Sequence, residues 1–308
     1  MIKIIKKIKY ITGHPIVKYY TTHPVVLIKN RIIVLYLWFK KIINLDVNFI
    51  SNIHSEIPID VVIVAIDKDF DVLVHVVDSI RNNVMHPIGD IIIISPKSEI
   101  ITNLCKINKC IFIDENTVLP ITKKDINYAV AGVDRSGWLF QQLLKWSGDN
   151  YSKNDHFLVA DADSVFCRPQ LFIDNEKVIL AVSNQLCHIP YFEAYNKLTG
   201  DKIEPLINFT SHHALFQKSK LTALKQKIEK HCGIEWYRAI ISNIDMQEGS
   251  AVSDYETYGQ FVFSNYADEY ILEHWFNLSL SRSMLGKISS TLKKNYNKYK
   301  TISFHTYK

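Results

Sequence analysis

The sequence predicts an α/β fold with a mostly parallel sheet flanked by helices. Residues 59–66 form a continuous apolar run rich in β-branched side chains, which is typical of a strand buried on both faces. Residues 70–82 then place apolar side chains at helical spacing. The alternation continues with apolar runs at 91–94 and 110–113, separated by a helix-like stretch. This βαβαβ order favours parallel strands joined by right-handed crossovers.

Length and composition fit a globular protein with one large or two small domains. The 308 residues are 47% hydrophobic and include only ten glycines, which excludes disordered, collagen-like and glycine-rich repeat proteins. The five cysteines form no Cys-x-x-Cys pair, so we predict reduced thiols rather than a zinc site or a disulfide framework. This cysteine usage favours a cytoplasmic location.

Basic residues are concentrated at both ends of the chain. Residues 1–45 contain nine lysines and arginines and no acidic residue, and residues 274–308 contain seven and no acidic residue. All 31 acidic residues therefore lie in the segment between them. Basic ends suit a phosphate-rich ligand or an anionic membrane surface, and the alternative is a set of solvated lysines. The acidic body argues against a nucleic-acid partner.

The N-terminal segment is predicted to be a basic, apolar and helical extension over residues 1–57. Its apolar stretch at 24–45 is interrupted by four basic residues, and its longest uncharged run, 32–39, has eight residues. A spanning helix needs about 20 residues, so we predict no membrane span. Residues 1–45 are instead a candidate for peripheral membrane contact, and the alternative is a helix packed on the body.

Ligands of open parallel sheets bind at the carboxyl ends of the strands. The first two predicted strands end at Ala65, Asp67 and Ser95, which we expect to contact a nucleotide. The chain has neither a Gly-x-Gly-x-x-Gly loop after the first strand nor a Gly-x-x-x-x-Gly-Lys-Ser/Thr loop. The sequence therefore argues against a dinucleotide-binding fold and against a P-loop.

A second candidate anion site lies at the start of the predicted helix 136–146. Ser136 is a plausible N-cap residue, and Arg135 stands beside it. A helix N-terminus with an adjacent arginine is suited to binding a phosphate. The alternative is that Arg135 is an ordinary surface residue.

Two carboxylates directly follow the apolar stretch His156–Ala160. Asp161 and Asp163 are spaced i and i+2, which places them on the same side of a continuing strand. Two such charges repel unless a cation lies between them. Mg²⁺ and Mn²⁺ prefer carboxylate oxygens and often share them with ligand phosphates. We therefore predict a divalent metal bound by Asp161 and Asp163 together with a diphosphate, against the alternative of two solvated turn residues.

The Asp161-Ala162-Asp163 sequence at a strand end resembles the DxD motif of GT-A glycosyltransferases. Further stretches are similar to a family of uncharacterised bacterial and viral glycosyltransferase-like proteins: Gly137-Trp138 with Gln141-Gln142-Leu143-Leu144-Lys145, the run DADSVF at 161–166, Ser211-His212-His213 with Phe216, and SDYETYG at 253–259. The resemblance covers about residues 58–308. It implies a GT-A domain with a nucleotide-binding half at 58–165 and an acceptor half at 166–308.

The resemblance also implies ligands and roles. It implies a nucleotide-sugar donor, with a UDP-sugar favoured, Mn²⁺ or Mg²⁺ as cofactor, and a glycan, lipid or protein acceptor. Asp161 and Asp163 would bind metal and diphosphate, and Gln141 is a further donor-binding candidate. Many GT-A enzymes add a histidine near the C-terminus as a metal ligand, and His305 is the candidate here.

The second half offers candidates for acid–base chemistry. An inverting transferase needs a carboxylate to accept the proton of the acceptor hydroxyl, and Asp254 or Glu256 would suit. In the alternative, Ser253 and Glu256 form a helix capping box. His212 and His213 face opposite ways if they lie on a strand, so only one can reach a sugar, and His213 is our candidate.

The sequence is also compatible with two other functions. Asp161 and Asp163 also resemble the nucleophile motif of haloacid-dehalogenase-like phosphatases, although there the nucleophile strand opens the domain, whereas here three α/β units precede it. A non-catalytic nucleotide-sugar-binding module is the other alternative. Loss of either aspartate would have favoured that module, and both are present.

Overall fold

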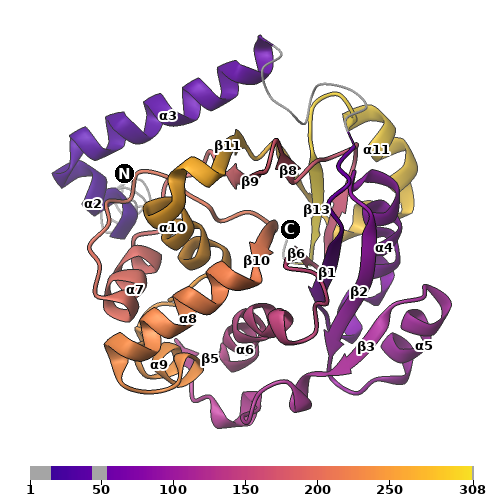
Figure 1. Ribbon diagram of the computed structural model, residues 1–308, viewed down its shortest axis with the longest axis horizontal. Coiled ribbons are helices and arrows are strands. Elements are labelled where there is room, and N and C mark those ends of the chain that lie inside the picture. The colour runs from indigo at the N-terminus through magenta and orange to yellow at the C-terminus, as the bar shows by residue number, and fades with distance from the viewer. Residues whose placement is uncertain (1–14, 44–53, 307–308) are drawn as a thin grey trace, which may run out of the picture.

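The computed structural model describes residues 15–43 and 54–306, and its centre is a five-stranded sheet (Figure 1). Four of these strands are parallel, and β10 at one edge is antiparallel to its neighbour β6. In spatial order the strands are β10 (His213–Gln217), β6 (His156–Asp161), β1 (Ile59–Val64), β2 (Ile88–Ser95) and β3 (Ile111–Asp114). The predicted α/β fold with a mainly parallel sheet is confirmed.

Burial on both faces explains why the central strands are continuous apolar runs. All six residues of β1 are buried, because neighbouring strands flank it on both edges and helices cover both faces. Its last residue, Val64, pairs with Ile94 of β2 and with Asp161 of β6. The carboxyl ends of three adjacent strands therefore meet at one edge of the sheet, where open α/β sheets bind ligands.

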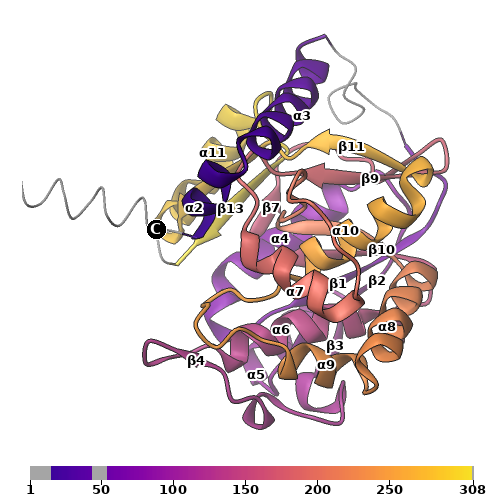
Figure 2. The ribbon, with the colours of Figure 1, turned by 90° about the vertical axis from the view of Figure 1, so that its left-hand side faces the viewer.

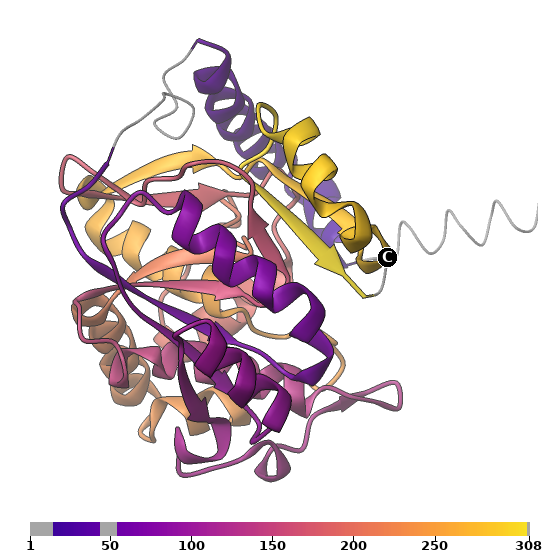
Figure 3. The same ribbon diagram turned by 90° about the vertical axis from the view of Figure 1, so that its right-hand side faces the viewer.

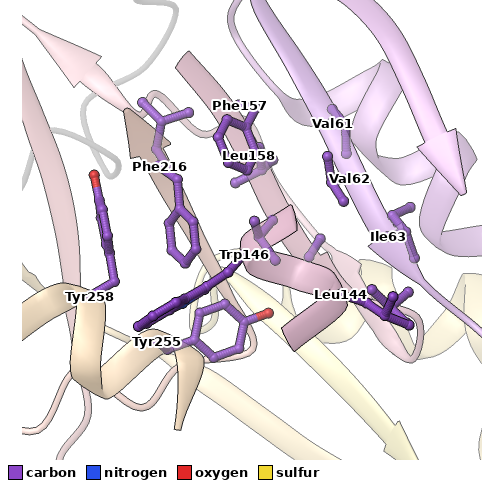
Figure 4. Packing of buried hydrophobic residues seen from close by; sticks show 14 of the residues in the cluster. Val61, Val62, Ile63, Leu144, Trp146, Phe157, Leu158, Phe216, Tyr255 and Tyr258 are labelled. Carbon is purple, nitrogen blue, oxygen red and sulfur yellow. The ribbon is translucent and has the colours of Figure 1, made fainter. Parts of the chain in front are cut away.

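Helices cover the two faces of the central sheet. In Figure 1, α4 and α5 lie on one side of the sheet, and α6, α8 and α10 lie on the other. Figure 4 shows Trp146 of α6 beside Phe216 of β10 and Tyr255 of α10, and Leu144 of α6 near Ile63 of β1. The helices of the body are α4 (Phe70–Asn83), α5 (Glu99–Ile107), α6 (Ser136–Trp146), α7 (Ile189–Thr199), α8 (Lys218–Cys232), α9 (Trp236–Ser242), α10 (Asp254–Tyr266) and α11 (Ile288–Asn295).

Two smaller sheets extend the fold in the second half of the chain. One contains β8 (Ile173–Asp174), β9 (Lys177–Val182) and β11 (Tyr270–His274), and the other contains β7 (Ser164–Phe166), β12 (Asn277–Ser281) and β13 (Thr301–His305). A two-residue hairpin, β4 (Ala129–Val130) and β5 (Val133–Asp134), precedes α6. Since β13 pairs antiparallel with β7, the end of the described chain lies beside the strand that follows the two aspartates.

The described part of the N-terminal extension is helical, as predicted, and it packs on the body. It consists of α2 (Pro15–Thr22) and α3 (Pro24–Ile42), which lie across the molecule beside α7 and β11 (Figures 2 and 3). Residues 1–14 and 44–53 of the predicted extension lie outside the described residues. The proposed domain limits stay a prediction, and the division at 165/166 falls within β7.

Candidate functional site

A cavity of about 250 Å³ opens at the carboxyl edge of the central sheet. It lies where β1 and β6 end, between the helix α6 and the last strand, β13. Its lining is mostly polar and charged. The lining residues are Val64, Lys68, Asp69, Trp138, Gln141, Gln142, Lys145, Asp161, Ala162, Asp163, His212 and His305.

Asp161, Asp163 and His212 form a cluster in this cavity. One ligand atom from each of them can be chosen so that all lie within 4.8 Å of one another. Asp161 is the last residue of β6, and its backbone N–H donates to the His212 carbonyl over 2.9 Å. The Asp163 carbonyl accepts from the Phe304 N–H, also over 2.9 Å. The backbone of two other segments therefore fixes both aspartates.

His305 lies in the same cavity. Its Nδ1 is 3.0 Å from Oδ2 of Asp163, and its ring centre is 5.1 Å from that of His212. The pairing of β13 with β7 brings it there although it lies 142 residues beyond Asp163 along the chain. This position places the His305 ring beside the cluster.

Lys145 on α6 neutralises the cluster from within the protein. Its Nζ is 2.6 Å from Oδ1 of Asp161 and 3.2 Å from Oδ2 of Asp254, and its side chain is only 9% exposed. Burial acts to raise the pKa of Asp161, but the Lys145 ammonium and the hydrogen bond with His212 outweigh it and hold that pKa well below its usual range. Asp161 is therefore a carboxylate at neutral pH.

Tyr255 completes the surroundings of Asp161. Its hydroxyl donates to Oδ1 of Asp161 over 2.8 Å, and the Lys145 ammonium lies 4.4 Å from the centre of its ring. Figure 4 shows Tyr255 beside Trp146 and Phe216, with its hydroxyl pointing away from them. Oδ1 of Asp161 thus accepts from two protein groups, and Oδ2 contacts His212.

The residue types fit a divalent cation. Two carboxylates and an imidazole are a common donor set for Mn²⁺, whereas Mg²⁺ prefers oxygen ligands only. Asp163 is the less constrained of the two aspartates, since its side chain contacts only His305 and, at 3.4 Å, the adjacent Ser164 among the described residues. The carboxylate of Asp163 is therefore the more available of the two to a cation, with Asp161 and His212 beside it.

The structure brings four of the sequence candidates into this cavity, namely Gln141, Asp161, Asp163 and His305. Four others lie near it without lining it. Ala65 and Ser95 are fully buried at the ends of their strands. Asp67 is exposed on a turn, and its neighbours Lys68 and Asp69 do line the cavity.

Arg135, the fourth of these residues, donates from Nε to the Gly249 carbonyl over 2.6 Å and stacks on Trp138. It is also the N-cap residue of α6, so Ser136 does not have that role.

His213 does not face the site. It is 3% exposed and packs between the rings of Phe166 and Phe172, where burial, with the charges of His212 and Lys300, lowers its pKa to about 3. The side chains of the two adjacent histidines point in opposite directions, as expected. His212, however, is the one that lines the cavity. His212 therefore replaces His213 as the candidate site residue.

Asp254 and Glu256 are both buried away from the cavity lining. Asp254 is 3% exposed and faces Lys145 from the side opposite Asp161. Glu256 is 1% exposed and accepts from the backbone N–H groups of Phe209 and Thr210, at 2.9 and 3.1 Å. Its carboxylate thus ties a loop to α10, and Ser253 caps the helix through the Glu256 N–H. Glu256 therefore does not line the cavity.

Sequence reasoning missed Lys145, Gln142, Trp138 and Tyr255 as individual site residues. The sequence did contain a pattern that could have identified the residues on α6. Positions 138, 141, 142 and 145 follow the i, i+3, i+4, i+7 spacing of one helix face, which is the face that lines the cavity. No local signal marks Tyr255, because its contact with Asp161 depends on how α10 packs.

A second cavity of about 230 Å³ lies beside the first and is lined by Trp38, Asn184, Gln185, His274, Trp275, Phe276, Asn277, Ser279 and Tyr299. Trp275 separates the two cavities, with its ring centre 4.8 Å from that of His212. Trp275 Nε1 and His274 Nδ1 are buried and have no hydrogen-bond partner among the described residues. Aromatic rings with nearby amides and unsatisfied polar atoms suit a polar ligand such as a sugar.

Comparisons with known proteins give one family and several similar folds. No curated protein matches the chain. Among solved structures, mouse xyloside xylosyltransferase 1 in its apo form is 12% identical over 82% of this chain and 99% of that one, with a TM-score of 0.45. The galactosyltransferase LgtC, in complex with donor and acceptor sugar analogues, is 14% identical over 80% and 87%, with a TM-score of 0.43.

A third solved structure is glucosyl-3-phosphoglycerate synthase from Mycobacterium tuberculosis, in complex with Mn²⁺, UDP and glucosyl-3-phosphoglycerate. It is 12% identical over 71% of this chain and 70% of that one, with a TM-score of 0.38. The family model described as "Family of unknown function (DUF6492)" matches residues 68–297, which include α6, both aspartates, His212 and α10. The chain therefore belongs to this family of unknown function.

Proposed function

We propose that this protein is a metal-dependent glycosyltransferase that uses a nucleotide-sugar donor. The observation that carries the proposal is the cluster of Asp161, Asp163 and His212 in a polar cavity at the carboxyl edge of a parallel sheet. Such an edge is where α/β folds bind nucleotides, and a carboxylate–imidazole cluster there suits a cation that pairs with a diphosphate. The resemblance of the segment to a DxD motif supports the same function.

In this proposal the chain's own residues have distinct tasks. Asp163, Asp161 and His212 would hold Mn²⁺ or Mg²⁺, which when bound offsets the negative charge of the leaving diphosphate. Lys145 and Tyr255 hold Asp161 ionised and in place. Gln141, Gln142 and Trp138 on α6 and Lys68 after β1 line the space beside the cluster and would bind the donor.

The second cavity is the proposed acceptor site. Trp275 offers its ring next to His212 and an unpaired Nε1 donor, and Asn184, Gln185 and Ser279 supply further polar groups. A sugar bound there would lie one side chain away from the cluster. Because the lining is aromatic and polar, and burial lowers the pKa of His274 to about 4 and so keeps it neutral, a neutral sugar-bearing acceptor fits better than a charged one.

The phosphatase alternative is less well supported by this fold. It would need Asp161 as the attacking nucleophile, with an oxygen directed at a phosphate. The nucleophile strand of those phosphatases opens the domain, whereas β6 follows β1, β2 and β3 along this chain.

The test is thermal unfolding of the full chain with UDP-, GDP-, CMP- and dTDP-sugars, each with and without Mn²⁺. A ligand at about 100 times its Kd adds roughly 2.7 kcal/mol to the free energy of unfolding when it binds only the folded state. We expect one nucleotide class, with a UDP-sugar favoured, to raise the melting temperature only when Mn²⁺ is present.

The matched variants are Asp163→Asn and Asp268→Asn. The first removes a proposed metal ligand, and the second changes an exposed aspartate after α10. We expect the Mn²⁺-dependent shift to vanish in Asp163→Asn and to persist in Asp268→Asn. A shift that survives in Asp163→Asn, or no shift with any donor, would contradict the proposed function.

A further inference from the structure

We propose that the outer face of α3 docks on an anionic membrane surface. Nine of the 17 exposed large hydrophobic side chains in the described part of the chain lie between residues 25 and 43. They are Val25, Ile28, Ile32, Leu35, Tyr36, Trp38, Phe39, Ile42 and Ile43, which we call the α3 outer face. Their exposed fractions range from 46% to 63%. A contiguous apolar patch of this kind marks an interaction site.

The outer face is separate from the face of α3 that builds the fold. Val26, Asn30, Val34 and Leu37 are the buried residues of α3, and their spacing of three and four defines the opposite, inner face. The helix is thus apolar nearly all round, although only its inner face packs on the body. A helix of this composition is normally covered on both sides, by protein or by lipid.

Polar contacts fix which face of α3 points outward. The buried Asn30 side chain donates to the Leu206 carbonyl over 2.8 Å. Arg31 donates to the Asn184 carbonyl over 3.0 Å and to Asn30 itself. Rotating the helix to bury the outer face would break these contacts and would leave Asn30 without its partners, which is costly for a buried amide.

The charges beside the outer face favour an anionic partner. Described parts of the two acid-free, basic segments of the sequence, 1–45 and 274–308, meet at the end of α3, where the Lys41 ammonium lies 4.5 Å from the ring centre of Phe276. Lys41 of α3 donates to the Lys298 carbonyl over 3.4 Å, and Lys293, Lys294 and Lys298 are exposed. Basic residues flanking an apolar helix face match the negative headgroups of a membrane better than they match a second copy of the same basic surface.

The geometry fits a helix lying on the membrane rather than across it. None of the helices in residues 15–43 and 54–306 combines the length and the apolar character that crossing a bilayer requires. Trp38 and Tyr36 on the outer face are residue types enriched at membrane interfaces. Trp38 also lines the second cavity, so a docked α3 would hold that cavity at the lipid surface.

The test is flotation of the full chain with phosphatidylcholine vesicles and with vesicles that also contain phosphatidylglycerol. We expect binding to the anionic vesicles, weakened by added salt, because lysines near the surface act electrostatically. The double variant Ile32→Ser, Leu35→Ser should bind at least about tenfold more weakly, since it removes two apolar side chains from the interface. Lys293→Gln, Lys294→Gln should lose about tenfold on anionic vesicles only.

The control is Ile107→Ser, which removes an apolar side chain that is 80% exposed on α5, away from α3. It should bind vesicles like the wild type. Equal flotation of the Ile32→Ser, Leu35→Ser variant and the wild type would overturn the proposal. So would a wild-type dimer in light scattering that becomes a monomer in this variant while neither protein binds vesicles, because the outer face would then be covered by a second copy.

This proposal can fail separately from the proposed function. None of the substituted residues lines the metal cavity, so the Mn²⁺-dependent donor shift should be the same in the wild type and in all three variants. Loss of vesicle binding with an unchanged donor shift would support the membrane face, whatever the acceptor is.

Discussion

Lys145 is the residue on which the electrostatics of the candidate site depend. It lies between two carboxylates, Asp161 and Asp254, and burial alone would disfavour all three charges. Its ammonium is the cation that allows Asp161 to stay ionised while the cluster is without metal. A bound divalent ion would add positive charge next to a carboxylate that is already ionised.

Replacing Lys145 should therefore destabilise the fold. Lys145→Met keeps the aliphatic stem but leaves two carboxylates close together, and we expect a loss of about 3 kcal/mol in the free energy of unfolding. The control is Lys227→Met, because the pair of Lys227 with Asp201 is about one third exposed and should contribute less than about 1 kcal/mol. Urea unfolding of both variants measures the difference, and equal losses would contradict this role of Lys145.

His86 gives a pH prediction outside the site. The Phe172 N–H donates to its Nε2 over 2.9 Å, so Nε2 is unprotonated and Nδ1 donates to the Ile57 carbonyl over 3.0 Å. Burial is the main cause that lowers the pKa of His86 below its ordinary value. The folded state therefore keeps His86 neutral at pH values where the unfolded chain protonates it, so its contribution to stability falls as pH drops below the ordinary histidine pKa.

We expect the stability difference between the wild type and His86→Gln to shrink as the pH falls below about 6.5. The slope for one proton is at most about 1.4 kcal/mol per pH unit. Chemical denaturation over this pH range measures it. A difference that stays constant or widens toward acid pH would show that His86 does not stay neutral in the fold.

At the scale of elements, the packing of α10 positions Tyr255 and Asp254 against α6. Gly259 allows this approach, because a Cβ at that position would lie 2.6 Å from the Cβ of the buried Phe209. The loop that holds Phe209 is tied to the same helix by Glu256. The stretch SDYETYG at 253–259 thus supplies a helix cap, a site residue and a close helix contact in succession.

Gly259→Ala should destabilise the protein by about 2 kcal/mol, although alanine is the better helix former, since overpacking exceeds the gain in helix propensity. Gly137→Ala on α6 is the matched control. A Cβ at Gly137 meets no described atom within 4 Å, so that change should be neutral or slightly stabilising. Thermal unfolding compares them, and a stabilised Gly259→Ala would refute the packing argument.

Elements were more predictable than contacts. The apolar runs that become β1, β2 and β3 and the helical spacing of α4 are local patterns, so the sequence could identify them. The position of His305 beside Asp163 depends on the pairing of β13 with β7, and the sequence alone could suggest it only through resemblance. The choice between His212 and His213 depends on which face of β10 meets the core, and the burial of Glu256 depends on a loop that no local pattern marks.

At the scale of the whole molecule, the metal cavity, the second cavity and the helix α3 lie next to one another. The central sheet presents the metal cavity at its carboxyl edge, β13 closes that cavity from the C-terminal side, and α3 lies beside the second cavity. Donor site, acceptor site and membrane-facing helix are thus neighbours in the proposed account. Trp275 and Trp38 are the residues that connect them.

The most direct test of the central claim is the anomalous scattering of Mn²⁺ in crystals grown with Mn²⁺ and UDP. We expect one strong peak within about 2–2.5 Å of an Asp163 carboxylate oxygen, beside Asp161 and His212, with the diphosphate next to it. An absent peak at the cluster, or Mn²⁺ and UDP bound elsewhere on the molecule, would contradict the assignment of this cavity as a metal-dependent nucleotide-sugar site.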